Sequence, residues 1–213
     1  MEITAGSWAP WLAVAGLGAF HGLNPAMGWL FAVALGFQRR SGAVVLAALA
    51  PIALGHALSV AVVLVAVLFA GLLLDQHLFS RTAGIILIGW ACWHAAYGHR
   101  RRVRIGMQTG LLGLGIWSFL MASAHGAGLM LVPIVLPLCL SPGSVGGAAP
   151  DQPTLLAFAA LGVHTGTMLI VIGAVSTLVY RCTDLAFLRR GWINLDLVWS
   201  AALIVTGSLL LIR

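Results

Sequence analysis

Four histidines lie inside long apolar stretches of the chain, at His21, His56, His125 and His164. Ionisable groups at membrane depth are costly and are usually functional. Imidazole is neutral near pH 7, so it can sit in an apolar interior and there take up a proton or bind a transition metal. We therefore interpret the four as one shared polar site or pathway. For any one of them alone, a neutral ring hydrogen-bonded within the helix bundle is the alternative.

Other polar and sulfur-containing side chains share helix faces with these histidines, because a spacing of three or four residues places two side chains on one face. The hydroxyl or amide partners follow their histidines by three residues, and a methionine follows the last histidine by four. The candidate substrate or metal residues are His21, Asn24, His56, Ser59, His125, His164 and Thr167, with Met27 and Met168 as secondary members.

A helix break is predicted next to the first histidine. Pro25 removes a backbone hydrogen bond, and Gly22 and Gly28 weaken the helix on either side. The apolar run around it is long enough to cross a bilayer. We expect an interrupted transmembrane helix whose break at Pro25 frees backbone groups and turns His21 and Asn24 towards an interior cavity.

The elements that position these residues follow from composition. The chain has 213 residues, of which 61% are hydrophobic and only 8% charged, whereas soluble domains carry about 25% charged residues. This excludes a water-exposed globule and predicts an all-α polytopic membrane protein. We expect six transmembrane helices, over residues 9–37, 43–74, 82–98, 108–140, 154–180 and 192–212, with kinks at Pro51, Pro133 and Pro137.

The eleven basic residues are all arginines, and they fall mainly in the loops after the first, third and fifth predicted crossings. Arg81 and Arg213 alone are on the opposite side. The positive-inside rule then places both termini outside the cytoplasm, in a multi-pass protein of the inner (plasma) membrane. Arginines in short loops between apolar runs indicate topology, so nucleic acid is not an expected partner.

Short motifs recur between the two halves of the chain. Phe20-His21-Gly22 in the first crossing corresponds to Ala124-His125-Gly126 in the fourth, and the segment around His56 in the second corresponds to that around His164 in the fifth. Three crossings per half is an odd number, so the halves insert with opposite orientation. We therefore predict one transmembrane domain over residues 1–213, with inverted repeats 9–98 and 108–212 and a cytoplasmic linker 99–107. Inverted repeats with broken helices are a common design of secondary transporters.

Two of these segments resemble a known family. His21-Gly-Leu-Asn-Pro-Ala-Met27 is similar to the His-Ala-Leu-Glu-Pro-Asp-His type of motif in the first helix of nickel/cobalt permeases and urease-accessory-type permeases, and Leu54-Gly55-His56-Ala57-Leu58-Ser59-Val60 resembles the Leu-Gly-His-Ser segment of their second helix. These permeases belong to the LysE-type exporter superfamily, built from two inverted three-helix halves. The resemblance implies that fold and a transport function.

The chain departs from that motif at its most distinctive positions. Asn24 stands where the family has an acidic residue, Ala26 where it has aspartate, and Met27 where it has the second histidine. The remaining ligands are imidazole, thioether, hydroxyl and carboxamide. This set favours a softer or borderline metal over magnesium or calcium.

These features favour a secondary transporter of a transition-metal cation, with proton coupling through the intramembrane histidines. Two alternatives stay open: a transporter of a neutral or anionic small solute, and a membrane module that binds haem or passes electrons. Nothing in the pattern indicates an enzyme or requires a cofactor, although the site can hold a transition-metal ion. The expected partners are the lipid bilayer and a small ion or solute, and a homo-oligomer is compatible with the sequence.

Overall fold

The computed structural model describes residues 8–73, 75–97, 110–140, 152–182 and 195–212. All regular structure in these ranges is helical, which confirms the all-α prediction. The elements are α1 (Trp8–Leu23), the 3-10 helix η1 (Pro25–Met27), α2 (Trp29–Arg39), α3 (Gly42–Ala47), α4 (Leu49–Leu73), α5 (Gln76–Tyr97), α6 (Leu111–Ala124), α7 (Ala127–Leu140), α9 (Gln152–Cys182) and α11 (Leu195–Ile212). The predicted linker 99–107 and Arg189, Arg190 and Arg213 lie outside the described residues.

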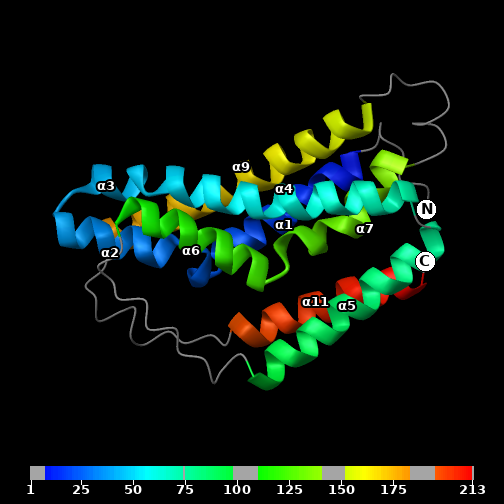
Figure 1. Cartoon of the computed structure of the whole chain (residues 1–213). Helices are drawn as coiled ribbons and strands as arrows, with labels where there is room; N and C mark the ends of the chain where they lie inside the picture. The colour runs from blue at the N-terminus through cyan, green and yellow to red at the C-terminus, as the bar shows by residue number, and fades with distance from the viewer. Residues whose placement is uncertain (1–7, 74, 98–109, 141–151, 183–194, 213) are drawn as a thin grey trace.

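Most of the helices run back and forth along one long axis, and the α5–α11 pair is inclined to it (Figure 1). Helix α1 packs along α9, α4 packs along α6 and α7, and α5 packs along α11. The start of α1 and the end of α11 lie at the same end of the molecule, and the turn between α2 and α3 lies at the other.

Several helices have the length and apolarity of membrane spans. Gly42–Val67 and Thr154–Cys182 are each long and apolar enough to cross a bilayer, and the bent pair Leu111–Ala124 and Ala127–Val135 is a third candidate when counted as one span. Large apolar side chains such as Leu54, Leu112 and Ile170 are more than two-thirds exposed. Apolar helices that also expose large apolar side chains indicate a protein that associates with a membrane.

The long apolar runs are interrupted, though not all at prolines. Residues 9–37 form α1, η1 and α2, so the break at Pro25 is confirmed. The run from 108 to 140 breaks at His125 and Gly126, whereas Pro133 and Pro137 lie inside α7. The reason is the backbone of Gly126, whose φ of 65° is left-handed and ends the preceding helix. The second run breaks at Ala48, just ahead of Pro51.

Candidate functional site

The first helix break holds His21 at the end of α1. Asn24 starts the 3-10 turn, and its side-chain oxygen accepts a hydrogen bond from the Ala26 N–H at 3.0 Å. Gly28 then adopts φ 129°, which a residue with a Cβ rarely adopts, and α2 continues from there. The Asn24 amide is thus used as a cap for the backbone, as Asn prefers at a helix start.

The histidines of the two breaks make the same local hydrogen bond. Nδ1 of His21 lies 2.8 Å from the Leu17 carbonyl oxygen, and Nδ1 of His125 lies 2.8 Å from that of Met121. A carbonyl oxygen only accepts, so Nδ1 carries the hydrogen in each neutral ring. The lone pair is then on Nε2, and in His21 this nitrogen is buried without a hydrogen-bond partner.

Three of the four histidines meet in the interior. His21 of α1, His56 of α4 and His164 of α9 are fully buried, and their ring centres are 4.8 Å (His21–His164), 5.4 Å (His56–His164) and 5.7 Å (His21–His56) apart. The rings of His56 and His164 are stacked, with 20° between their planes. We call these three residues the histidine cluster.

Most of the ring nitrogens in the cluster have no hydrogen-bond partner. Nε2 of His21 and both nitrogens of His56 and His164 are buried and unpaired. His164 faces the Val14 carbonyl of α1, but the geometry falls short of an ordinary hydrogen bond. A buried polar group left unpaired costs about 1–3 kcal/mol. Five such nitrogens in one place indicate a site shaped for something other than packing.

Glycines allow the helices that carry the cluster to come together. A Cβ on Gly18 of α1 would overlap the His164 carbonyl oxygen and the Thr167 hydroxyl, and one on Gly22 would lie 2.6 Å from the Met168 carbonyl oxygen. Gly18 and Gly22 are four residues apart, the small-xxx-small spacing typical of close helix crossings in membranes. This spacing is a sequence signal for the α1–α9 contact.

The fourth histidine packs against Trp199 of α11. The Trp199 indole lies edge to face against both His21, at 4.6 Å between ring centres, and His125, at 5.1 Å. It is 1% exposed, and Phe20 stacks on it at 5.4 Å. Trp199 therefore contacts both His125 and His21 of the cluster, while the imidazole–imidazole ring contacts join three of the predicted four.

Indole N–H groups satisfy carbonyls at both helix breaks. Trp29 donates to the Leu23 carbonyl and Trp117 to that of Ala26 at the first break, each at 3.1 Å. At the second break, Trp90 donates to the Ala124 carbonyl at 2.7 Å and Trp199 to that of His125 at 2.8 Å. Sequence reasoning missed these four residues. The sequence signal for them was the position of each tryptophan inside an apolar run, because an indole N–H that is away from water needs a hydrogen-bond acceptor.

The hydroxyl helpers are engaged with backbone or with another hydroxyl. Ser59 Oγ lies 2.8 Å from Ser123 Oγ of α6, and Thr167 Oγ1 donates to the carbonyls of Val163 and His164. The secondary methionines are both buried: Met27 is 1% exposed and Met168 is fully buried. Among the residues that the structure describes, no three His, Cys, Asp or Glu side chains have donor atoms arranged to hold a metal ion as they stand.

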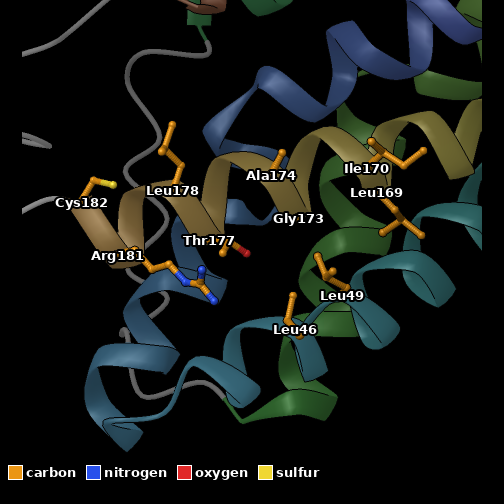
Figure 2. Close-up of a pocket in the computed structure, with 10 residues that line it drawn as sticks. All are labelled: Leu46, Leu49, Leu169, Ile170, Gly173, Ala174, Thr177, Leu178, Arg181 and Cys182. Atoms are coloured by element: carbon orange, nitrogen blue, oxygen red, sulfur yellow. The ribbon is translucent and has the colours of Figure 1, made fainter.

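Two grooves on the molecule are apolar and separate from the cluster. One, of about 650 Å³, lies along α9 opposite Leu46 and Leu49, with Arg181 near one end (Figure 2). The other, of about 690 Å³, runs between α1, α7 and α11 and reaches Phe20, the residue stacked on Trp199. Neither groove is lined by a cluster histidine. Only the second approaches the cluster, and the aromatic pair closes it there.

Comparison with known proteins gives no relative for this chain, so its function is inferred from the chemistry of the site. No model of a known protein family matches the chain. Searches of curated proteins and of solved structures likewise find no match.

Proposed function

We propose that this protein is a six-span membrane protein built from two inverted three-helix halves. The helix contacts support this arrangement, since the first span of each half packs against the second span of the other: α1 against α9, and α6 with α7 against α4. The third spans, α5 and α11, pack on each other. The matching hydrogen bonds of His21 and His125 at the two breaks are what an internal repeat predicts.

The proposed function is secondary transport of a transition-metal cation. The observation that carries it is the histidine cluster, in which two helices of the first half and one of the second bring three imidazoles into an apolar interior. Transporters with inverted repeats bind their substrate near the bilayer midplane, where the halves meet and helices are broken. His21 beside its break fits that description.

The spacing of the rings suits a single ion. A metal lies about 2.1 Å from an imidazole nitrogen, hence about 3.2 Å from the ring centre, and ligand angles of about 90–120° then separate ring centres by about 4.5–5.6 Å. The observed separations run from 4.8 to 5.7 Å. These separations are close to that range, and binding one ion requires the rings to turn about their side-chain bonds so that their nitrogens converge.

Proton coupling follows from the same nitrogens. A proton and a metal ion compete for the imidazole lone pair, so binding one displaces the other. With Nδ1 of His21 bonded to the Leu17 carbonyl, exchange at this residue takes place at Nε2. Exchange of a metal ion for a proton at these nitrogens couples metal transport to a proton gradient, and this coupling needs no further ionisable group in the interior.

The described arginines support the proposed orientation in the inner membrane. Arg39, Arg40 and Arg181 lie where α2 and α9 end, and Arg81 lies near the start of α5 at the other end of the bundle. The excess of basic residues marks the cytoplasmic side. Both termini are then outside the cytoplasm.

The haem alternative is less well supported by the geometry. Two axial imidazoles on one iron lie on opposite faces of a flat macrocycle, with ring centres about 6.4 Å apart. The cluster rings are closer than this, and two of them are stacked face to face. The cluster leaves no such gap between any two of its rings.

The test is transport by the purified full chain reconstituted into vesicles that contain a metal-sensitive dye. We expect protein-dependent metal flux, driven by an imposed pH gradient, that falls at least about tenfold in His164→Ala. His77→Ala is the matched control, since His77 is exposed and its described hydrogen bond is made by its backbone N–H. Equal flux in His164→Ala and the unmodified protein, or none in either, contradicts the proposal.

A further inference from the structure

Among the side chains that the structure describes, none that is buried with the cluster carries a negative charge. The chain contains five acidic residues, Glu2, Asp75, Asp151, Asp184 and Asp196. Asp75 is the one whose side chain the structure describes, and it is exposed at the start of α5, where its Oδ1 accepts from the N–H groups of His77 and Leu78. Among the described residues, the buried polar side chains are histidine, asparagine, serine and threonine.

The charge of a cation sets the free-energy cost of binding it in such a site. The cost of moving an ion from water into an apolar interior rises with the square of its charge, so a divalent ion costs about four times as much as a monovalent ion of the same size. Protein sites that hold Zn²⁺ on three neutral imidazoles complete the shell with water or hydroxide. The described part of this interior supplies no carboxylate in that position.

Two buried methionines, one on α9 and one in η1, point the same way. Met168 lies one turn after His164 on α9, and its backbone carbonyl is where Gly22 of α1 makes its closest approach. Met27, on the other side of the first break, is also buried in the core that contains Met168. Thioether sulfur favours Cu(I) among the biological metals, and imidazole also suits copper.

We propose that the cation carried by the histidine cluster is monovalent and soft, Cu(I) or its analogue Ag(I), rather than a divalent ion such as Ni²⁺, Co²⁺ or Zn²⁺. This rests on the proposed function and specifies its substrate. Three neutral imidazoles satisfy a monovalent d¹⁰ ion without an anion. The same three rings leave a divalent ion with its full charge in the apolar interior.

The experiment measures metal binding to the purified full chain in mild detergent. Cu(I) is titrated under reducing, oxygen-free conditions against a chromogenic Cu(I) chelator, Ag(I) is titrated separately, and Ni²⁺, Co²⁺ and Zn²⁺ are titrated with a divalent-metal dye. We expect one Cu(I) or Ag(I) per chain, bound at least about 100-fold more tightly than any of the divalent ions. His56→Ala should lose that ion, and His77→Ala should keep it.

The outcomes separate this inference from the proposed function. If a divalent ion binds as tightly as Cu(I) and is lost in His56→Ala, the charge argument is wrong while metal transport stands. If Cu(I) binds equally to His56→Ala, the ion is elsewhere and the inference is overturned. If the unmodified protein binds no metal, both proposals fall. Far-UV circular dichroism of His56→Ala checks that the variant is folded, and His164→Ala replaces it where it is not.

Discussion

The first helix break is held by its own residues together with one indole from α6, Trp117, whereas the second is held by indoles from two other helices. Between α1 and α2, Asn24 caps the 3-10 turn and Trp29 donates to the Leu23 carbonyl just upstream. Between α6 and α7, the freed carbonyls of Ala124 and His125 are satisfied by Trp90 of α5 and Trp199 of α11. Unpaired backbone groups are costly inside a membrane, so each break needs one of these solutions.

This difference explains why the two break histidines have different surroundings. His21 is placed by a local turn and packs against His164 of α9. The His125 ring packs against the indole that caps its own carbonyl, so the group that stabilises the second break is also the ring neighbour of its histidine. The first half therefore supplies the histidine at its break to the proposed site. In the second half, the carbonyls at the break are bonded to tryptophans of α5 and α11.

The largest effect should come from the crossing that brings the first break to the cluster. Gly18→Val places side-chain atoms where the His164 carbonyl lies, and backbone cannot yield as a flexible side chain does. We expect a loss of more than about 3 kcal/mol of stability, seen as aggregation in size-exclusion chromatography in detergent. Gly16→Val is the control, since nothing lies within 4 Å of a Cβ at Gly16. A monodisperse Gly18→Val protein would show that the α1–α9 crossing is wrong.

The glycines of the two breaks should differ in their tolerance of alanine. Gly28 has φ 129° and its Cβ would lie 2.7 Å from Ile52 Cδ1, so Gly28→Ala should cost about 3 kcal/mol. Gly126 has φ 65°, which L residues can adopt, and its nearest neighbour is 3.5 Å away, so Gly126→Ala should cost about 1 kcal/mol. Unfolding in SDS followed by far-UV circular dichroism measures both. A reversed order would contradict the described geometry of the breaks.

Replacing the tryptophans that cap the carbonyls tests whether the two breaks depend on different helices. Trp199→Phe keeps an aromatic ring against Phe20 but removes the indole hydrogen bond to the His125 carbonyl, at a cost of about 1–3 kcal/mol. Trp29→Phe frees a carbonyl on Leu23, which is 56% exposed, and should cost less than about 1 kcal/mol. The same SDS titration compares the two variants. Equal costs would mean that the second break does not depend on α11.

The smallest predicted effect tests charge at the first break. Asn24→Asp keeps an oxygen that accepts from the Ala26 N–H and adds a negative charge three residues from His21. We expect the preference for Cu(I) over Zn²⁺ to fall about tenfold in a competition titration. Asn24→Ala, which loses the cap without adding charge, is the control and should leave the preference unchanged. No difference between Asp and Ala would argue against a cation near this break.

Part of this structure was predictable because it depends on local sequence. Proline cannot donate a backbone hydrogen bond, and Gly22 and Gly28 weaken the helix on either side, so the break at Pro25 follows from a few neighbouring residues. The burial of His56 and His164 follows from their place in the middle of long apolar runs. The helical class follows from composition, since a chain with so few charges has no water-soluble alternative.

The rest depends on contacts between distant segments. The second break was expected at the prolines of α7, but prolines can remain inside a membrane helix, and it is the left-handed Gly126 that ends α6. The surroundings of His125 depend on Trp199, 74 residues further along the chain. The spacing of Ser59 and Thr167 put them on the faces of their histidines, yet the Ser59 hydroxyl bonds to Ser123 of α6 and the Thr167 hydroxyl bonds to carbonyls of its own helix.

The most direct test of the central claim is the metal content of single histidine variants, purified in parallel after metal loading and analysed by mass spectrometry. The account predicts one ion per chain in the unmodified protein, loss of that ion in His21→Ala, His56→Ala and His164→Ala, and retention in His125→Ala, whose ring packs against Trp199. Equal metal content in all four variants, or loss in His125→Ala alone, would contradict a site formed by the three clustered imidazoles.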